Sequence, residues 1–293
     1  MTRQVFFAPD LACLTATVQP VGAGDAAIPG HAATVATDPG HAATEVPATL
    51  PLTIDGPEAH HLRVKRIEVG ESVDLVDGAG WRATATLTNH DGKRATFAMQ
   101  QPVFEPAPTP RLVLIQALVK GSKEEQIVQM ATEVGADAII TWQAGRSISR
   151  WADQKCEKQL QKLREAARAA TKQSRRSRIP QVEHARNIEQ IYRHLNALTD
   201  QAETASGEAN VPTVLVAHES ATERVETVLA HHIPAAVVGI VIGPEGGISE
   251  DELAAFQNRG AHLVMVGDTV MRAVTAGVVT LALVRSAWQR RAR

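Results

Sequence analysis

Hydrophobic residues in the second half of the chain gather in short runs that are separated by stretches with a helical period. Residues 237–242 read Val-Val-Gly-Ile-Val-Ile, an uninterrupted and mostly β-branched run that is typical of a strand buried on both faces. Further runs of this kind lie at residues 111–118, 136–142, 213–217 and 263–266. Strands that alternate with helices are typical of βαβ units, so the pattern predicts an α/β domain over residues 111–293.

Polar residues at the ends of the intervening stretches indicate where helices begin and end. Ser249 precedes Glu252 by three residues, which is the spacing of a capping box. Ser122 has the same relation to Glu125, and Gly135 is a fitting C-terminal stop for the helix that would begin there. Other helices are expected at residues 153–176, 188–198 and 275–284.

The first half of the chain has a different pattern, in which apolar and polar residues alternate over short segments. Alternation occurs at residues 69–78, 81–87 and 94–100, and Asp91-Gly92 between the last two segments is a hairpin signal. Short strands joined by tight turns predict a small β-barrel over residues 1–105. Prolines are dense between residues 102 and 110, which favours an extended connection, so we place the domain boundary there.

Residues 15–51 interrupt this first domain with a segment dominated by Ala, Thr, Pro and Gly. The sequence Pro-Gly-His-Ala-Ala-Thr begins at Pro29 and recurs at Pro39. With few large apolar side chains, the segment buries too little surface to offset the entropy of ordering it. We interpret it as a mobile surface insertion. His31 and His41 belong to an exposed repeat, so no metal site is expected.

Length and composition set broad limits on the class of protein. The chain has 293 residues, enough for about two domains. No apolar run reaches the roughly 18–20 residues of a membrane span, and the apolar start is too short for a signal peptide, so a cytoplasmic protein is expected. The net charge is −2, but basic residues concentrate between Arg146 and Arg178, and this local block is the electrostatic feature that could attract a polyanion.

Two glycine-containing turns follow predicted strands. Residues 243–247 read Gly-Pro-Glu-Gly-Gly, where the proline lacks an N–H and the glycines allow a close approach of the backbone to another molecule. The second turn begins at Gly267, and His218 ends a third strand. Ligands of α/β proteins bind beyond the carboxyl ends of strands, so these segments predict a small-molecule site. Taken singly, a glycine-rich segment is as often only a tight turn, and His218 as often a packed or capping histidine.

The wording of the two turns resembles a known family. Residues 242–249 (Ile-Gly-Pro-Glu-Gly-Gly-Ile-Ser) and 266–276 (Val-Gly-Asp-Thr-Val-Met-Arg-Ala-Val-Thr-Ala) are similar to the cofactor loops of the SPOUT RNA methyltransferases. Within these they resemble the group that methylates uridine N3 in 16S ribosomal RNA of the small ribosomal subunit. The resemblance implies an α/β domain with a trefoil knot, an N-terminal PUA-like barrel, S-adenosylmethionine as the cofactor, and a homodimer that completes the site across its interface.

The resemblance also implies roles for single residues. Arg272 matches a family arginine and would stabilise an ionising uracil, whereas Glu245 is a base, a cofactor contact or only a brace for its turn. The chain departs from the family where Asp268 and Thr269 replace a proline and an arginine, and where Val274 replaces a glutamate. The implied cofactor contacts are Leu215, His218, Gly243, Pro244, Glu245, Gly246, Gly247, Val266, Gly267, Asp268, Val270, Met271, Thr275 and Ala276.

Basic residues are the expected RNA contacts, because guanidinium groups bind phosphates bidentately and keep their charge. A basic helix face is also often only solvated. The residues expected to bind RNA are Arg63, Arg66, Arg146, Lys172, Arg175, Arg176 and Arg178. Two alternatives stay open: a SPOUT enzyme that acts on tRNA, including ribose methylation, and an RNA-binding homologue without catalysis. A P-loop enzyme is disfavoured, because no Lys-Ser/Thr pair follows the glycine turn.

Overall fold

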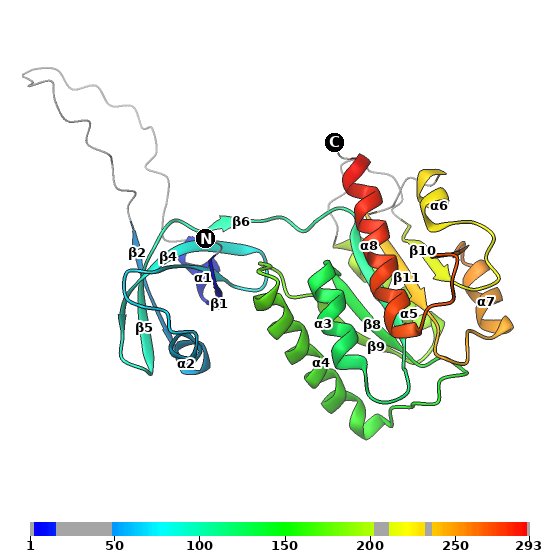
Figure 1. Cartoon of the computed structure of the whole chain (residues 1–293), viewed down its shortest axis with the longest axis horizontal. Coiled ribbons are helices and arrows are strands. Elements are labelled where there is room, and N and C mark those ends of the chain that lie inside the picture. Colours follow the sequence, from blue (N-terminus) through cyan, green and yellow to red (C-terminus); the bar gives the residue numbers. More distant parts are fainter. Residues whose placement is uncertain (1–2, 16–48, 202–210, 232–235, 292–293) are drawn as a thin grey trace, which may run out of the picture. The chain divides into compact units, whose positions relative to one another are not determined.

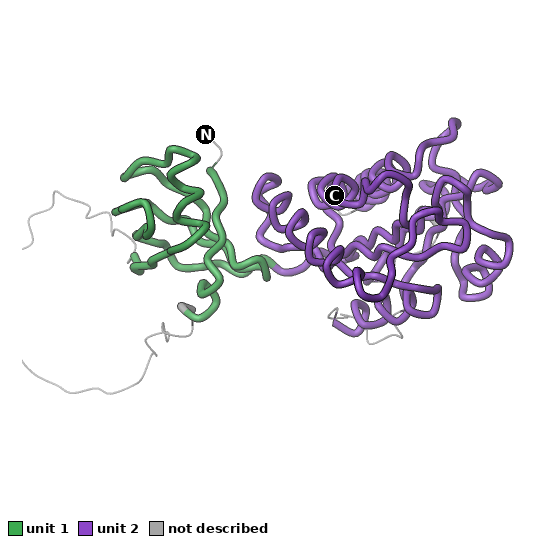
Figure 2. The backbone as a smooth tube through the Cα atoms, turned by 90° about the horizontal axis from the view of Figure 1, so that it is seen from below, with its two compact units in different colours: residues 1–105 green, residues 106–293 purple. Residues whose placement is uncertain are grey.

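The computed structural model describes residues 3–15, 49–201, 211–231 and 236–291. The chain divides into two compact units, Met1–Glu105 and Pro106–Arg293, which Figure 2 colours green and purple. The predicted insertion at residues 15–51 lies almost entirely outside the described residues. Its predicted end is two residues late, because a strand already begins at Leu50.

The first unit is built around one six-stranded sheet. Its strands run in the order β1-β3-β4-β5-β2, and β6 pairs with β4. All described pairs are antiparallel except that of β1 with β3. Alternate side chains of β4 are buried, as the sequence pattern predicts, and they pack on Phe6, Phe97 and Leu62. The elements are β1 (Val5–Phe7), α1 (Leu11–Thr15), β2 (Leu50–Asp55), α2 (Gly56–Val64), β3 (Ser72–Val76), β4 (Trp81–His90), β5 (Arg94–Met99) and β6 (Val103–Phe104).

The hairpin predicted at Asp91-Gly92 is present between β4 and β5. The Asp91 carboxylate accepts hydrogen bonds from the backbone N–H groups of Lys93 and Arg94, at 2.8 and 2.7 Å. Gly92 has a φ of +90°, which L side chains rarely adopt. Local chemistry therefore fixes this turn, and with it the pairing of β4 and β5.

The second unit contains a parallel six-stranded sheet in the order β12-β10-β11-β7-β8-β9. Figure 1 labels β8, β9, β10 and β11 of this sheet. Every described pair in it is parallel. The predicted fold class, an α/β domain after a small β-rich domain, is confirmed. The strands are β7 (Arg111–Ala117), β8 (Ala138–Trp142), β9 (Gln181–Ala185), β10 (Thr213–Ala217), β11 (Val237–Ile242) and β12 (His262–Val264).

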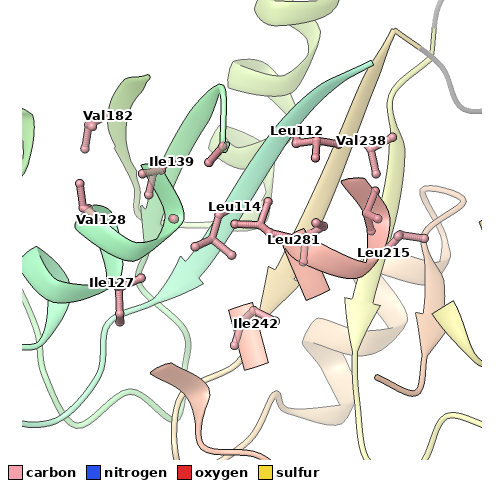
Figure 3. Close-up of a cluster of buried hydrophobic side chains, with 14 of the residues drawn as sticks. Leu112, Leu114, Ile127, Val128, Ile139, Val182, Leu215, Val238, Ile242 and Leu281 are labelled. Atoms are coloured by element: carbon pink, nitrogen blue, oxygen red, sulfur yellow. The ribbon is translucent and has the colours of Figure 1, made fainter. Parts of the chain in front are cut away.

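Helices cover both faces of this sheet and bury its apolar side chains. On one face the core includes Ile127, Leu163 and Leu281, and Figure 3 shows Leu281 beside side chains of the central strands. On the other face it includes Leu195 and Phe256. The first face carries α3 (Glu124–Val134), α4 (Asp153–Gln173), α6 (Val225–His231) and α8 (Ala273–Arg291), and the second carries α5 (Ile188–Asp200) and α7 (Glu250–Gln257).

The last helix returns to the middle of the sheet. β12 lies at the edge, yet α8 packs on β7 and β11, so the chain passes back across the ends of intervening strands. A Cβ on Gly277 would lie 3.0 Å from both Gln116 Oε1 and Leu114 Cδ1, so glycine permits this close packing. Such a return is what a knotted C-terminal region requires.

Some expected boundaries are wrong for local reasons. Ser122 does not cap α3: the helix begins at Glu124, and Ser122 has a φ of +50°. α4 ends at Gln173 instead of residue 176, because the chain turns at Arg175, with a φ of +59°. β9 and α6 were not expected at all.

In the described part of the chain, no helix is both long and apolar enough to cross a bilayer.

Candidate functional site at the ends of the parallel strands

Three loops leave the same edge of the parallel sheet. Ala217 at the end of β10 pairs in register with Ile242 at the end of β11, and on its other side with Val264 at the end of β12. Because the strands are parallel, the segments that follow them begin side by side. These are residues 218–224, 243–249 and 265–272, and they bring together most of the cofactor contacts predicted from the sequence.

The conformation of the 243–249 loop explains its glycines. The N–H of Gly247 donates to the carbonyl of Pro244 at 2.9 Å, and Gly247 has a φ of +73°. A Cβ on Gly243 would lie 2.7 Å from Ile248 Cγ1, inside contact distance. The loop then enters α7 through a complete capping box between Ser249 and Glu252, as predicted. Two of the glycines are thus required by the turn itself.

Gly246 has a different reason to be glycine. A Cβ there would lie 3.1 Å from the carbonyl oxygen of Arg146 and 3.2 Å from its Cβ. The Arg146 guanidinium also donates to the carbonyl of Gly246, at 3.4 Å. The molecule that approaches this glycine is therefore the protein's own chain, in the segment that follows β8.

Glu245 braces its loop against the segment that follows β7. Its carboxylate accepts the backbone N–H of Lys120, at 3.1 and 3.4 Å from the two oxygens. Of the three roles considered for Glu245, the structure supplies contacts for the brace. Nearby, burial and a smaller contribution from the Glu245 charge raise the pKa of Glu124, at the first position of α3.

The 265–272 loop leaves its backbone largely unused. Within the described residues, the amide and carbonyl groups of residues 266–271 make no hydrogen bonds to other backbone groups. Asp268 forms an ion pair with Arg224, which ties this loop to the one after β10. Val270 is 85% exposed. Free amides and carbonyls at the end of a parallel sheet are suited to binding a nucleoside through the backbone.

Arg272 stands between this loop and α8. Its carbonyl accepts the N–H groups of Thr275 and Ala276, each at 2.9 Å, and so starts the helix. Its side chain is exposed and bonds to none of the described residues. Val274, which replaces the family's glutamate, packs against the apolar core.

His218 and Leu215 occupy less open positions than their predicted roles suggest. His218 Nδ1 lies 3.2 Å from the N–H of Ser220 and 2.7 Å from its hydroxyl, so its ring stabilises the turn after β10. Leu215 is fully buried in the middle of β10 and contributes to the core. The buried side chain of Leu215 is therefore not available to a ligand, and only its backbone or a neighbouring residue could make that contact.

The predicted RNA contacts belong to both units, and those of the second unit lie at two opposite edges of its sheet. Arg63 and Arg66 belong to the first unit. Arg146 follows β8 and lies at the edge that carries the three loops. The others come at or after the C-terminal end of α4, which runs back along the sheet, so they lie at the opposite edge: Lys172, Arg175, Arg176 and Arg178.

Arg176 is bound inside the protein. Its guanidinium donates to the carbonyls of Thr132 and Ala136, at 2.9 and 2.6 Å, and pairs with Asp137 at 3.1 Å. Burial lowers its pKa, while the Asp137 charge opposes that effect. In the sequence, Arg176 is one of several neighbouring basic residues, and only the fold shows that its guanidinium is bound inside the protein.

A buried glutamine was missed by sequence reasoning. Gln116 is 1% exposed, and its Oε1 has no hydrogen-bond partner among the described residues. It lies at the end of β7, against Gly277 of α8. The available signal was a single polar residue inside the apolar run of residues 111–118.

Family models match both units. A model of an RNA methyltransferase domain matches residues 105–285, and a model of an RNA methyltransferase PUA domain matches residues 54–99. The first match covers more than half of the chain.

Individual relatives agree with these matches. "Ribosomal RNA small subunit methyltransferase E" of Mycobacterium bovis is 38% identical over 244 residues, which cover 80% of this chain and 88% of the relative. The protein of that name from Bacillus subtilis is 25% identical over 239 residues, covering 79% and 88%. A solved ribosomal RNA small subunit methyltransferase E from Neisseria gonorrhoeae, bound to S-adenosyl methionine, has a TM-score of 0.67 at 22% identity, covering 98% of both chains.

Proposed function

Because this chain belongs to the ribosomal RNA small subunit methyltransferase E family, an RNA methyltransferase family, we propose that it transfers a methyl group from S-adenosylmethionine to N3 of a uridine in 16S ribosomal RNA. The observation that best supports the cofactor is the backbone of residues 266–271, which pairs with no other backbone group among the described residues and lies beside two other loops at the same sheet edge. These groups fit a nucleoside that is bound by amides and carbonyls.

The cofactor would be held mainly by the two glycine-containing loops. S-adenosylmethionine, when bound, supplies an electrophilic methyl group on a sulfonium, so the protein needs chiefly to position the reactants. The backbone of residues 243–247 and 266–271 would hold it, with His218 at the rim. Leu215 would support these contacts from below, and Thr275 and Ala276 would face it from the first turn of α8.

Arg272 is our candidate catalytic residue. A neutral uracil imide is a poor nucleophile, so the N3 proton must leave, and negative charge then develops on the ring. The Arg272 guanidinium is exposed beside the loops and has no carboxylate partner among the described residues, so it is available to stabilise that charge. Glu245 is assigned the bracing role that its contact with Lys120 supports.

The RNA would extend beyond this site. Arg146 is the predicted contact at the same sheet edge, whereas Lys172, Arg175 and Arg178 would reach RNA at the opposite edge, or RNA bound by a second subunit. Arg63 and Arg66 would add contacts from the PUA-like unit. We further propose a homodimer that acts in the cytoplasm on RNA of the small ribosomal subunit, and a monomeric mass in solution would contradict the dimer.

Calorimetric titration of S-adenosylmethionine tests the cofactor site. Among the described residues, a Cβ on Gly267 would have only Met271 Cε within 4 Å, at 3.4 Å, so the loop has room for the Cβ of Gly267→Leu, which adds bulk there. We expect this variant to lose at least about ten-fold in affinity, since its side chain takes space that the nucleoside needs. Ala254→Leu adds the same side chain on the exposed face of α7 and should bind as the wild type does.

Nucleoside mapping tests the reaction. Mass spectrometry of 16S ribosomal RNA after incubation should show methyluridine substituted at N3, and Arg272→Gln should lower kcat by about 10²–10³-fold. Methylation of tRNA alone, or of a ribose, would instead support the alternative hypothesis of a SPOUT enzyme that acts on tRNA. RNA binding without any methyl transfer, with the cofactor present, would indicate a non-catalytic homologue.

A further inference from the structure

The loop at residues 145–150 lies beside the candidate site and has an unusual alternation of side chains. Its sequence is Gly-Arg-Ser-Ile-Ser-Arg. Arg146, Ile148 and Arg150 are exposed, whereas Ser147 is buried and Ser149 is half-buried. Ile148 is 72% exposed, so this loop presents a large aliphatic side chain between two exposed arginines.

Hydrogen bonds hold this loop in place on its inner side. The Ser149 hydroxyl donates to the carbonyl of Val119 at 2.8 Å, and the side chain of Gln143 donates to the carbonyl of Ser149 at 3.3 Å. The N–H of Gly145 donates to the Glu252 carboxylate at 2.8 Å. The inner side is therefore anchored to three other segments, and the three outward side chains are displayed from a fixed backbone.

Each of the two arginines is held by one hydrogen bond, Arg146 to the glycine loop and Arg150 to its own loop. Arg146 donates to the carbonyl of Gly246 at 3.4 Å, and Arg150 donates to the carbonyl of Gly145 at 3.3 Å. Neither forms an ion pair with a carboxylate among the described residues. Each guanidinium uses one donor to fix its position and keeps others for an external acceptor.

We infer that the 145–150 loop is a reader of the RNA strand next to the target nucleotide, in which Arg146 and Arg150 bind phosphate and Ile148 packs on an unstacked base or its ribose. The inference rests on the proposed function and adds Ile148 and Arg150 to it. Two guanidinium groups that have no carboxylate partner among the described residues complement a phosphate backbone, which is their usual multivalent partner. RNA recognition favours unpaired nucleotides whose faces are open to apolar contact.

The position of the loop gives this contact a consequence for catalysis. The loop touches residues 243–247 directly through Arg146 and Gly246, and Glu252 joins it to the cap of α7. RNA that is held here would lie against the same sheet edge as Arg272. Loss of the contact should therefore raise KM for RNA and leave the affinity for S-adenosylmethionine unchanged.

The test separates the two kinds of contact by their salt dependence. Binding of 16S ribosomal RNA to the full chain is measured by filter retention at several salt concentrations for Arg150→Gln and Ile148→Ser. Removing one phosphate contact should weaken binding and reduce the slope of log K against log salt by about 0.7. Ile148→Ser should weaken binding by about five- to ten-fold with an unchanged slope, because it removes only apolar contact.

Arg193→Gln is the matched control, since Arg193 is an exposed arginine on α5, away from this loop. Affinity and slope for Arg150→Gln that equal those of the control would overturn the inference. So would a loss of dimer mass in Ile148→Ser without a change in RNA binding, which would make the loop a protein interface. Methyl transfer to 16S ribosomal RNA is measured for the same proteins. Failure of the proposed function would abolish methyl transfer in the wild type and in every variant, whereas failure of this inference alone would leave the wild type active.

Discussion

Glu252 accepts a hydrogen bond from Gly145, which lies 107 residues earlier in the sequence. One carboxylate oxygen accepts the N–H of Gly145 at 2.8 Å, and the other accepts the N–H of Ser249 at 3.0 Å and its hydroxyl at 2.8 Å. The glutamate of the α7 capping box is thus also the anchor of the 145–150 loop. Ser249 ends the glycine loop and Arg146 contacts Gly246, so this one side chain ties together two segments of the candidate site.

Glu252→Ala should loosen both segments. Removing the carboxylate leaves the backbone N–H groups of Ser249 and Gly145 without their acceptor, and we expect a loss of about 1–3 kcal/mol in the free energy of unfolding. Affinity for S-adenosylmethionine should fall as well. Denaturant unfolding and calorimetry measure the two effects. Glu252→Gln retains an acceptor oxygen and should lie between the wild type and Glu252→Ala; an alanine variant with unchanged stability and affinity would contradict this role.

Asp137 carries a second non-local contact at the opposite edge of the sheet. Its side chain, 9% exposed, pairs with Arg176 at 3.1 Å and Arg285 at 3.6 Å, and accepts the N–H of Leu112 at 2.9 Å. Asp137→Ala leaves two guanidinium groups without their counter-charge, so we expect unfolding to become easier by about 3–5 kcal/mol. Asp137→Asn keeps the acceptor for Leu112 and should lose less. An asparagine variant as stable as the wild type would show that charge pairing contributes nothing here, and equal stability of the two variants would show that the acceptor for Leu112 contributes nothing.

Features set by neighbouring residues could be predicted from the sequence. The strand at residues 237–242, the capping box at Ser249, the stop at Gly135 and the hairpin at Asp91 all depend on residues within a few positions of one another. The positions of the two cofactor-type loops also followed, because strand order in a parallel α/β unit brings successive strand ends to one edge.

Features set by distant residues could not be predicted. Nothing near Arg176 in the sequence indicates that Asp137 will pair with it, and nothing near Gly246 indicates that Arg146 fills the space beside it. β9 is a short edge strand with mixed burial, so its sequence carries little alternation. The role of Asp268, a departure from the family motif, becomes visible only through its ion pair with Arg224.

Tyr192 carries a buried hydroxyl whose removal should not destabilise the protein. Its hydroxyl is buried without a hydrogen-bond partner among the described residues, and burial raises its pKa to about 12. Tyr192→Phe removes this unsatisfied group and keeps the ring that Arg259 overlies at 5.6 Å. We expect the variant to be as stable as the wild type or up to about 1 kcal/mol more stable in denaturant unfolding. A clear destabilisation would mean that the hydroxyl has a partner, such as a bound water.

The stability of the second unit should depend on pH through His184. Its ring stacks on Trp151 with centroids 4.8 Å apart, and its Nδ1 lies 3.0 Å from the Thr141 hydroxyl. Burial, with a smaller contribution from the Arg186 charge, lowers the pKa of His184 from 6.5 to about 4. The folded state therefore keeps the ring neutral at pH values where the unfolded chain already binds a proton.

Because the pKa of His184 is lower in the folded state, acid should destabilise the protein. The neutral ring contributes its full stability above about pH 6.5, and this contribution is lost as the pH falls toward 4. Partial exposure of the ring reduces the loss to about 1–2 kcal/mol. The free energy of unfolding, measured by denaturant titration at intervals from pH 7.5 to about 4, should fall more steeply for the wild type than for His184→Gln, which has no titrating ring. Parallel curves for the two proteins would show that His184 does not titrate differently in the folded state.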